Sequence, residues 1–359
     1  MASRAALAAL AALTAIAAAD TDVAFYVLST AQTKRVNKTH AEPLHWIRRR
    51  ALPALATWGR HFDAVYFVVE ASFAASDDGR RCEPGATGQE LTCADLGGAT
   101  FLLSNCTNEY RGAGPCCKCD VGLAHAARTG ATKWAAFADD DVFFDASSLR
   151  ASLEPLDETK AFAVVPSGAR NRPPFKASVA CRTVMRQSYW AQPAILSRGA
   201  LALARAGLER RGVSEECALF SVSHEGGLGV FLWSLGIEPL GMPEPDFYVR
   251  DARRLPGLPT ADEAPQPARE RKVNARPVRG PRRPHGPLKP LAAAPIAVHR
   301  VGRGNDYPSF EAVEALFAKA RAAAPLALGH LARGGGIAPR AGRGGGGAFT
   351  AFRPEDCEA

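Results

Sequence analysis

The first part of the chain alternates short apolar runs with segments of helical spacing. Residues 23–29 (VAFYVLS) and 63–70 (DAVYFVVE) are rich in β-branched and aromatic residues, which is typical of strands buried on both faces. Between them, residues 45–58 carry apolar side chains at helical spacing. A strand, a helix and a second strand in this order predict a βαβ unit with parallel strands.

The same alternation continues along the chain and predicts an α/β fold with a mostly parallel sheet flanked by helices. Further strands are expected at residues 100–104, 133–138, 161–165 and 296–301, and helices at residues 119–129, 198–208, 226–235 and 309–323.

The N-terminal segment has the pattern of a secretory leader. An arginine at position 4 precedes the apolar run Ala5–Ala19, and Ala17 and Ala19 fit a small-residue cleavage site before Asp20. This run is shorter than the roughly 20 residues that a membrane-spanning helix needs. A cleaved signal peptide at residues 1–19 is therefore favoured over a Golgi-type signal anchor. Either one places the rest of the chain in the secretory pathway, as a Golgi or ER lumenal protein or a secreted one.

The cysteines agree with an oxidising compartment. The chain has nine, enough for four disulfides and one free thiol. Cys116, Cys117 and Cys119 resemble half a zinc site, but no second pair with histidines follows at a suitable distance, so disulfides are favoured over zinc. Two N-glycosylation sequons begin at Asn37 and Asn105 and are consistent with secretion.

The positive charge is concentrated in one segment. The net charge is +8, and residues 250–290 contain eleven Lys/Arg against four Asp/Glu, which is 11 − 4 = +7. Basic residues interleaved with aromatics would indicate a nucleic-acid interface, and this Pro/Arg-rich segment lacks them. We therefore expect a catalytic domain at 20–250, a linker or insert at 251–295, the C-terminal part of that domain at 296–330 and a disordered Gly-rich tail at 331–359.

The candidate chemistry lies at the triplet Asp139–Asp141, which follows the apolar strand at 133–138. Three adjacent carboxylates in an apolar setting repel one another and lose hydration, so a cation is expected to compensate them. Mn²⁺ and Mg²⁺ bind carboxylate and phosphate oxygens together, and the ends of parallel strands are where α/β sheets bind ligands. The alternative is a turn in which Asp140 or Asp141 caps a helix at residues 147–153.

Several segments together resemble the fringe-like and core-1 galactosyltransferase-like β-1,3-glycosyltransferases. Lys133-Trp134 followed by the triplet resembles the family's central signature. The other similar segments, in the order expected for the family, are residues 48–58 with 65–69, 104–107 with Cys116 or Cys117, 195–201, 224–233 and 298–299. The resemblance spans residues 23–301.

The resemblance implies a GT-A fold, with a Rossmann-like sheet in a single catalytic domain, and transfer of a sugar with inversion. The donor would be a UDP-sugar bound with Mn²⁺ or Mg²⁺, the acceptor a glycan or glycoprotein, and the linkage β-1,3. Asp141, Asp139 and His299 would hold the metal, and Asp139, Asp140 and Thr30 would bind the donor. Glu225 would be the catalytic base that deprotonates the acceptor hydroxyl. No nucleic-acid partner is implied, and a membrane would be contacted only through the N-terminal segment.

Each assignment has an alternative. Glu225 could be a carboxylate that stabilises a helix N-terminus, His224 is equally available for its role, and His299 could be a core histidine. Residues 190–193 (WAQP) also depart from the glycine-rich stretch of the family. An inactive, secreted glycan-binding protein with the same fold is therefore the second hypothesis.

Overall fold

The computed structural model describes residues 21–32, 34–35, 41–85, 87–108, 113–130, 132–166, 188, 191–220, 222–242, 248–249, 252, 255, 297–301 and 307–323. The expected leader, the tail and nearly all of the expected linker lie outside the described residues. Within them the chain forms two compact units, and it passes from the first to the second between Asp140 and Asp141. The first unit contains the described residues of 21–140 and 156–242, and the second contains residues 141–155 and those described from 248 to 323.

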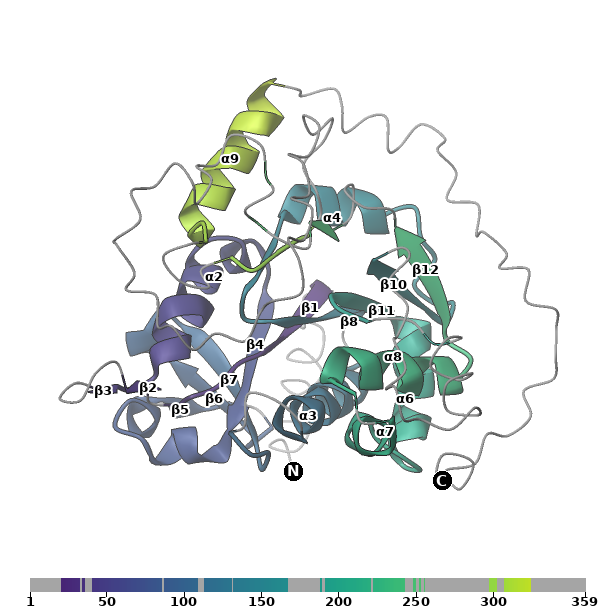
Figure 1. Cartoon of the computed structure of the whole chain (residues 1–359), viewed down its shortest axis with the longest axis horizontal. Helices are drawn as coiled ribbons and strands as arrows, with labels where there is room; N and C mark the ends of the chain where they lie inside the picture. Colours follow the sequence, from purple (N-terminus) through teal and green to yellow (C-terminus); the bar gives the residue numbers. More distant parts are fainter. Residues whose placement is uncertain are drawn as a thin grey trace, which may run out of the picture. The chain divides into compact units, whose positions relative to one another are not determined.

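The first unit is built on a nine-stranded mixed sheet in the order β12-β10-β11-β8-β1-β4-β7-β6-β5 (Figure 1). Seven strands run in one direction, and β11 and β6 run against them. The strands are β1 (Thr21–Leu28), β4 (Ala64–Glu70), β5 (Glu83–Pro84), β6 (Glu90–Cys93), β7 (Ala99–Ser104), β8 (Thr132–Asp139), β10 (Phe162–Pro166), β11 (Ala194–Ser197) and β12 (Glu238–Met242).

The four central strands are connected in the Rossmann-like manner. They lie in the order β7-β4-β1-β8, so the chain builds outward from β1 through β4 and β7 and then returns to place β8 on the other side of β1. The first crossover contains η1 (Ile47–Ala51) and α2 (Leu52–Ala56), and the last contains α3 (Ala113–Thr129). The strand order therefore reverses between β1 and β8, whose ends are paired through Leu28 and Asp139. In open α/β sheets this reversal is where ligands bind.

β1 is buried on both faces, as its continuous apolar run predicts. On one face, Tyr26 stacks between Tyr66 and Phe137 at centroid distances of 5.3 and 5.2 Å. On the opposite face, Phe25 packs against Trp58, which follows α2, at 4.8 Å. Successive residues of a strand point to opposite faces, so a strand with apolar residues at every position must be covered on both sides.

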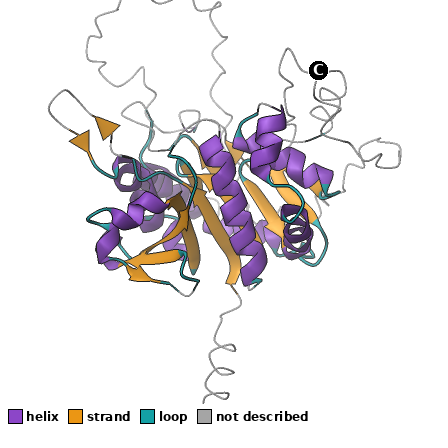
Figure 2. Ribbon diagram, turned by 90° about the horizontal axis from the view of Figure 1, so that it is seen from below, coloured by secondary structure: helices purple, strands orange, loops and turns teal. Residues whose placement is uncertain are grey.

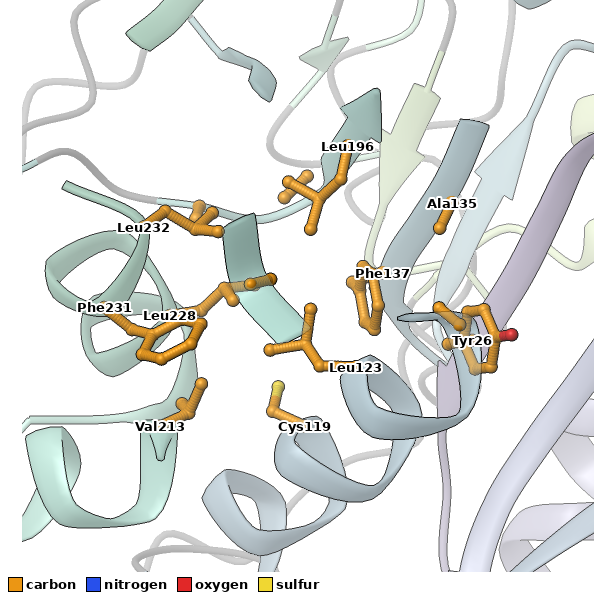
Figure 3. Packing of buried hydrophobic residues seen from close by; sticks show 14 of the residues in the cluster. Tyr26, Cys119, Leu123, Ala135, Phe137, Leu196, Val213, Leu228, Phe231 and Leu232 are labelled. Atoms are coloured by element: carbon orange, nitrogen blue, oxygen red, sulfur yellow. The ribbon is translucent and has the colours of Figure 1, made fainter. Parts of the chain in front are cut away.

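Four helices contribute residues to one core cluster with Tyr26 of the sheet, and Figure 2 shows helices lying against the strands. The four are α3, α6 (Arg198–Leu208), α7 (Val213–Phe220) and α8 (His224–Ser234). Figure 3 shows Leu123 of α3 and Leu228 of α8 pointing toward Phe137 on the sheet, with Val213 and Phe231 nearby in the same cluster. The disulfide Cys116–Cys217 joins α3 to α7, and both cysteines belong to this cluster.

The second unit contains a three-stranded sheet in the order β13-β14-β9, with β9 (Val142–Phe144) antiparallel to β14 (Ala297–His299) and β13 (Tyr248–Val249) parallel to it. Two helices accompany it, α4 (Ala146–Leu153) and α9 (Phe310–Ala323). Phe317 of α9 contacts Phe143 of β9 edge-on at 5.4 Å.

The remaining described elements are short. They are the two-stranded sheet of β2 (Lys34–Arg35) and β3 (Ala41–Glu42) and the 3₁₀ turns η2 (Gly59–His61), η3 (Ala71–Ala75), η4 (Gly79–Arg81) and η5 (Ala94–Leu96).

Most predicted elements are confirmed, and one local alternative is wrong. Helix α4 is capped by Asp145, whose side chain accepts a hydrogen bond from the amide of Ser148, so neither Asp140 nor Asp141 caps it. Helix α7 was not predicted. α3 begins six residues before the predicted start, because Ala113–Lys118 contains glycine, proline and two adjacent cysteines and does not read as a helix.

The cysteines form disulfides, as predicted, and not half a zinc site. Besides Cys116–Cys217, the pairs are Cys82–Cys93 and Cys106–Cys117, and Cys119 is the free cysteine of the described residues. Disulfides are typical of proteins that fold in an oxidising compartment. Among the described helices, none combines the length and the apolarity that crossing a membrane would require.

Candidate functional site

The aspartate triplet lies at the end of β8, beside the end of β1. β8 ends at Asp139, Asp140 and Asp141 form a turn, and β9 begins at Val142. Asp139 is partly exposed, whereas Asp140 and Asp141 are buried at 5% and 1% exposure. Within the first unit, the triplet therefore begins at the point where the strand order reverses, as expected for a ligand site in an α/β sheet.

Asp140 is held from both sides by residues of the first unit. Arg50 Nη1 donates to Asp140 Oδ1 at 2.8 Å, and the hydroxyl of Ser29 donates to Asp140 Oδ2 at 2.8 Å. Both members of the ion pair are buried, and Arg50 also lies over the ring of Trp46 at 4.1 Å. A buried carboxylate needs such partners because burial removes its hydration. Asp140 is thus occupied in fixing the turn.

A second buried ion pair lies under the ends of β1 and β4. Lys118 Nζ donates to Glu70 Oε1 at 2.8 Å and to the carbonyl of Ser29 at 2.7 Å. Glu70 also accepts from the hydroxyl of Thr30 at 2.6 Å and from the amide of Ala31 at 2.9 Å. Burial by itself would raise the pKa of Glu70, but Lys118 and these hydrogen bonds lower it below its ordinary value. The hydroxyl of Thr30, expected at the donor site, is therefore directed at Glu70.

Asp139 lies beside a histidine and a glutamate from α8. Nε2 of His224 is 2.9 Å from Asp139 Oδ1, and Nδ1 of the same ring is 3.5 Å from Glu225 Oε2. One ligand atom from each of the three residues lies within 4.8 Å of the others, which is close enough for them to share a metal ion. Of these two contacts, the one between His224 Nε2 and Asp139 Oδ1 is a hydrogen bond, whereas Glu225 Oε2 lies beyond hydrogen-bond geometry from the ring. The structure thus brings together Asp139 and Glu225, which the sequence placed far apart.

Glu225 lies in the first turn of α8, where the amides of a helix favour a negative charge. Its Oε2 atom is buried and accepts no hydrogen bond from the described residues. In this position the carboxylate can stabilise the helix through its charge, and its buried Oε2 can also accept a hydrogen bond from a ligand.

Asp141 and His299 are neighbours within the second unit. Asp141 Oδ1 is 3.2 Å from His299 Nε2, and the carbonyl of Asp141 accepts a hydrogen bond from the amide of Val301 at 2.9 Å. The contact follows from the pairing of β9 with β14, which sets His299 opposite Val142. The carboxylate and the imidazole that the resemblance assigns to the metal are therefore in contact.

Cys119 is not a candidate nucleophile although it lies close to the site. The thiol is fully buried, and burial raises its pKa well above the ordinary value, with further contributions from the charges of Asp120, Asp139 and Glu225. A cysteine reacts as its thiolate, so a thiol kept neutral in this way is inert.

The sequence did not indicate the cations that support the site. Arg50 is the last of three consecutive arginines, and Lys118 lies within the cysteine cluster, so neither stands out by type or spacing. The one available signal for Arg50 is its place on the apolar stripe of its helix, three residues after Ile47 and four before Ala54, both of which are buried.

No family model matches this sequence, and no curated protein matches it. Solved structures with a similar chain trace include 4-diphosphocytidyl-2C-methyl-D-erythritol synthase, at 15% identity over 61% of this chain and 86% of that one, with a TM-score of 0.30. They also include galactosyltransferase LgtC in complex with donor and acceptor sugar analogs, at 12% identity over 65% and 76%, with a TM-score of 0.33. TM-scores this low carry no argument about the chemistry of this chain, and the fold rests on its own strand order.

Proposed function

We propose that this protein is a metal-dependent glycosyltransferase that transfers a sugar from a nucleotide-sugar to a hydroxyl acceptor. The observation that carries the proposal is the position of Asp139, which ends β8 at the reversal of strand order and lies beside His224 and Glu225. This arrangement combines a place for a nucleotide with carboxylate and imidazole ligands and with a carboxylate that can accept a proton.

The residues fit a divalent metal. Asp139, Asp141 and His299 are the ligands we propose, as the resemblance implies, and the contact between Asp141 and His299 supports their pairing. Carboxylate oxygens with an imidazole nitrogen suit Mn²⁺ and Mg²⁺ when phosphate oxygens complete the coordination. When bound, the metal would neutralise the diphosphate and make it a better leaving group.

The chain's own residues would direct the exchange of bonds. The acceptor oxygen attacks the anomeric carbon of the donor, the bond from that carbon to the diphosphate oxygen breaks, and the nucleoside diphosphate leaves with the bonding electrons. The proton of the acceptor hydroxyl passes to Glu225, whose Oε2 is buried and open to a hydrogen bond. His224 contacts both Asp139 and Glu225, so it would set the distance between the two carboxylates.

The finer assignments depend on the sequence resemblance. They are a UDP-sugar as donor, Mn²⁺ as metal, inversion, a β-1,3 linkage to a glycan or glycoprotein, and work in the secretory pathway. Three disulfides support an oxidising compartment. Asp140 would act on the donor only through the turn, because both of its oxygens are bound by Ser29 and Arg50.

The test is nucleotide release from a panel of nucleotide-sugars. The chain from residue 20 onward, made in a secretory host, would be assayed with Mn²⁺ and with chelator, because slow hydrolysis of the donor needs no known acceptor. We expect release from one donor in Mn²⁺ and none with chelator. Asp141→Asn and Glu225→Gln should each reduce the rate by 100-fold or more, about 2.7 kcal/mol. Asp95→Asn, at an exposed carboxylate, is the matched control and should keep the parent rate.

The same preparation separates the catalytic hypothesis from a glycan-binding one. Binding of UDP that requires Mn²⁺, measured by thermal shift, without release from any donor or transfer to any acceptor would favour the inactive protein. Absence of both binding and release would contradict the nucleotide-sugar proposal.

A further inference from the structure

Two buried polar atoms of the first unit have no hydrogen-bond partner among the described residues. One is Nε2 of Gln192, a residue that is 5% exposed, and the other is Oε2 of Glu225. A buried polar atom without a partner loses its hydrogen bonds to water and gains none in return, so such atoms are rare in folded proteins. The protein therefore holds a donor and an acceptor that a ligand could satisfy.

The backbone brings these two residues to the same place. The amide of Ala191 donates to the carbonyl of Glu225 at 3.1 Å, so the residue before Gln192 lies against the first turn of α8. β11 pairs antiparallel with β8, with Ala194 opposite Phe137. β11 begins two residues after Gln192, beside β8, which ends at Asp139. Gln192 thus belongs to the site formed by Asp139, His224 and Glu225.

We propose that Gln192 and Glu225 together bind one hydroxyl group of the acceptor. The carboxamide nitrogen only donates and the carboxylate only accepts, whereas a hydroxyl does both. A hydroxyl between them would accept from Gln192 Nε2 and donate to Glu225 Oε2. An ammonium group could not accept from Gln192, and a carboxylate would be repelled by Glu225 and Asp139. The inference rests on the proposed function, in which Glu225 receives the proton of that hydroxyl.

The proposal also gives a role to Gln192, which lies in the segment where this sequence departs from the glycine-rich stretch of the family that it resembles. Glycines offer only backbone groups to a ligand, whereas Gln192 adds a side-chain donor. The departure then sets the specificity for an acceptor that presents a hydroxyl at this position.

Gln192→Leu tests the proposal because leucine has a similar size and no donor. Nε2 has no partner among the described residues, so the midpoint of urea unfolding should stay the same or rise. Acceptors would be methyl glycosides of the common hexoses and N-acetylhexosamines. We expect the acceptor KM to rise about tenfold or more. Gln89→Leu, at an exposed glutamine, is the matched control and should keep the parent KM.

An unchanged acceptor KM in Gln192→Leu would overturn the proposal. A lower urea midpoint together with the loss of donor hydrolysis would also overturn it, because Gln192 would then be structural. If the parent releases no nucleotide, or no glycoside accelerates release, saturation-transfer NMR with the same glycosides decides the subsite alone. A signal in the parent and in Gln89→Leu that is absent in Gln192→Leu supports it, and equal signals or none contradict it. Failure of donor turnover thus counts against the proposed function without deciding the subsite.

Discussion

Asp140 is the aspartate of the triplet whose two oxygens are both bound by residues of the first unit. Ser29 comes from the end of β1 and Arg50 from the helix that follows it, so two separate parts of the chain hold this carboxylate. The ion pair is buried on both sides. Breaking such a pair leaves one charge without compensation, which costs far more than losing an exposed pair.

Arg50→Met should lower the free energy of unfolding by about 3–5 kcal/mol, because Asp140 would remain buried and charged. Urea denaturation measures the change. Adding Asp140→Asn removes the charge and should recover most of the loss, while Arg49→Met, at an exposed arginine, should change stability by less than about 0.5 kcal/mol. Equal losses in the single and the double variant would contradict the ion-pair explanation.

The residue types of the site could be read from the sequence, but their partners could not. Asp139 and Asp141 are candidates because they belong to an acidic triplet at a strand end, and Glu225 and His299 are candidates through the family resemblance. The structure brings Asp139 to Glu225 and Asp141 to His299. Their metal and catalytic roles stay predictions. Arg50 was missed because burial of an arginine depends on which carboxylate lies opposite it, and that carboxylate is 90 residues away.

At the scale of elements, the packing of α7 against α8 positions the two site residues at the start of α8, His224 and Glu225. Gly227 of α8 allows close approach to α7, because a Cβ there would lie 2.3 Å from Sγ of Cys217. That sulfur is fixed by its disulfide with Cys116 and cannot move aside easily. Gly227 follows Glu225 by two residues. Its close contact with α7 therefore fixes how near to α7 the first turn of α8, with His224 and Glu225, can lie.

Gly227→Ala should therefore destabilise the protein by about 1–3 kcal/mol through overpacking, and should slow donor hydrolysis by displacing Glu225. Thermal unfolding and nucleotide release would measure the two effects. Adding Cys116→Ala and Cys217→Ala makes room for the extra methyl group. If Gly227→Ala were just as harmful without the sulfur, this packing explanation would be wrong.

α7 also contains a buried carboxyl group, that of Glu216, and its ionisation should lower the stability of the folded protein. Burial raises the pKa of Glu216 to about 7 from 4.5, although Arg211, 3.1 Å away, lowers it in part. When the pKa of a carboxyl group is higher in the folded than in the unfolded protein, its contribution to stability is fully present at pH values below the unfolded-state pKa. That contribution is lost as the pH rises through the folded pKa.

We expect the parent protein to lose stability relative to Glu216→Gln between pH 5 and pH 8. Urea unfolding of both proteins at several pH values across this range is the measurement. Glu215→Gln, its neighbour on the same helix, shows no such burial and should follow the parent. Parallel stability curves for the parent and Glu216→Gln would rule out the assignment.

At the scale of the whole molecule, one disulfide closes a much longer loop of the chain than another. Cys116 and Cys217 are 101 residues apart, whereas Cys82 and Cys93 are 11 apart. Closing a longer loop removes more conformational entropy from the unfolded chain. The long bridge also ties α3, which carries Lys118, to α7.

Replacing Cys116 and Cys217 by alanine should cost about 5 kcal/mol, against about 3 kcal/mol for the same change at Cys82 and Cys93. Chemical denaturation of the two double variants compares them directly within one unit. A larger loss from the short bridge would show that local packing, and not loop closure, governs these disulfides.

By itself the sequence determined the α/β class, the positions of the central strands and the candidate residues for metal binding and catalysis. It could do so because a strand buried on both faces must be apolar along its whole length, and because adjacent carboxylates at a strand end need compensation. Tertiary structure alone decided the order of the strands, the disulfide pairing, the cations that support the triplet and the contact between Asp139 and α8. These depend on which segments meet in space, and residues 85 to 111 positions apart meet here only through the folded sheet and its helices.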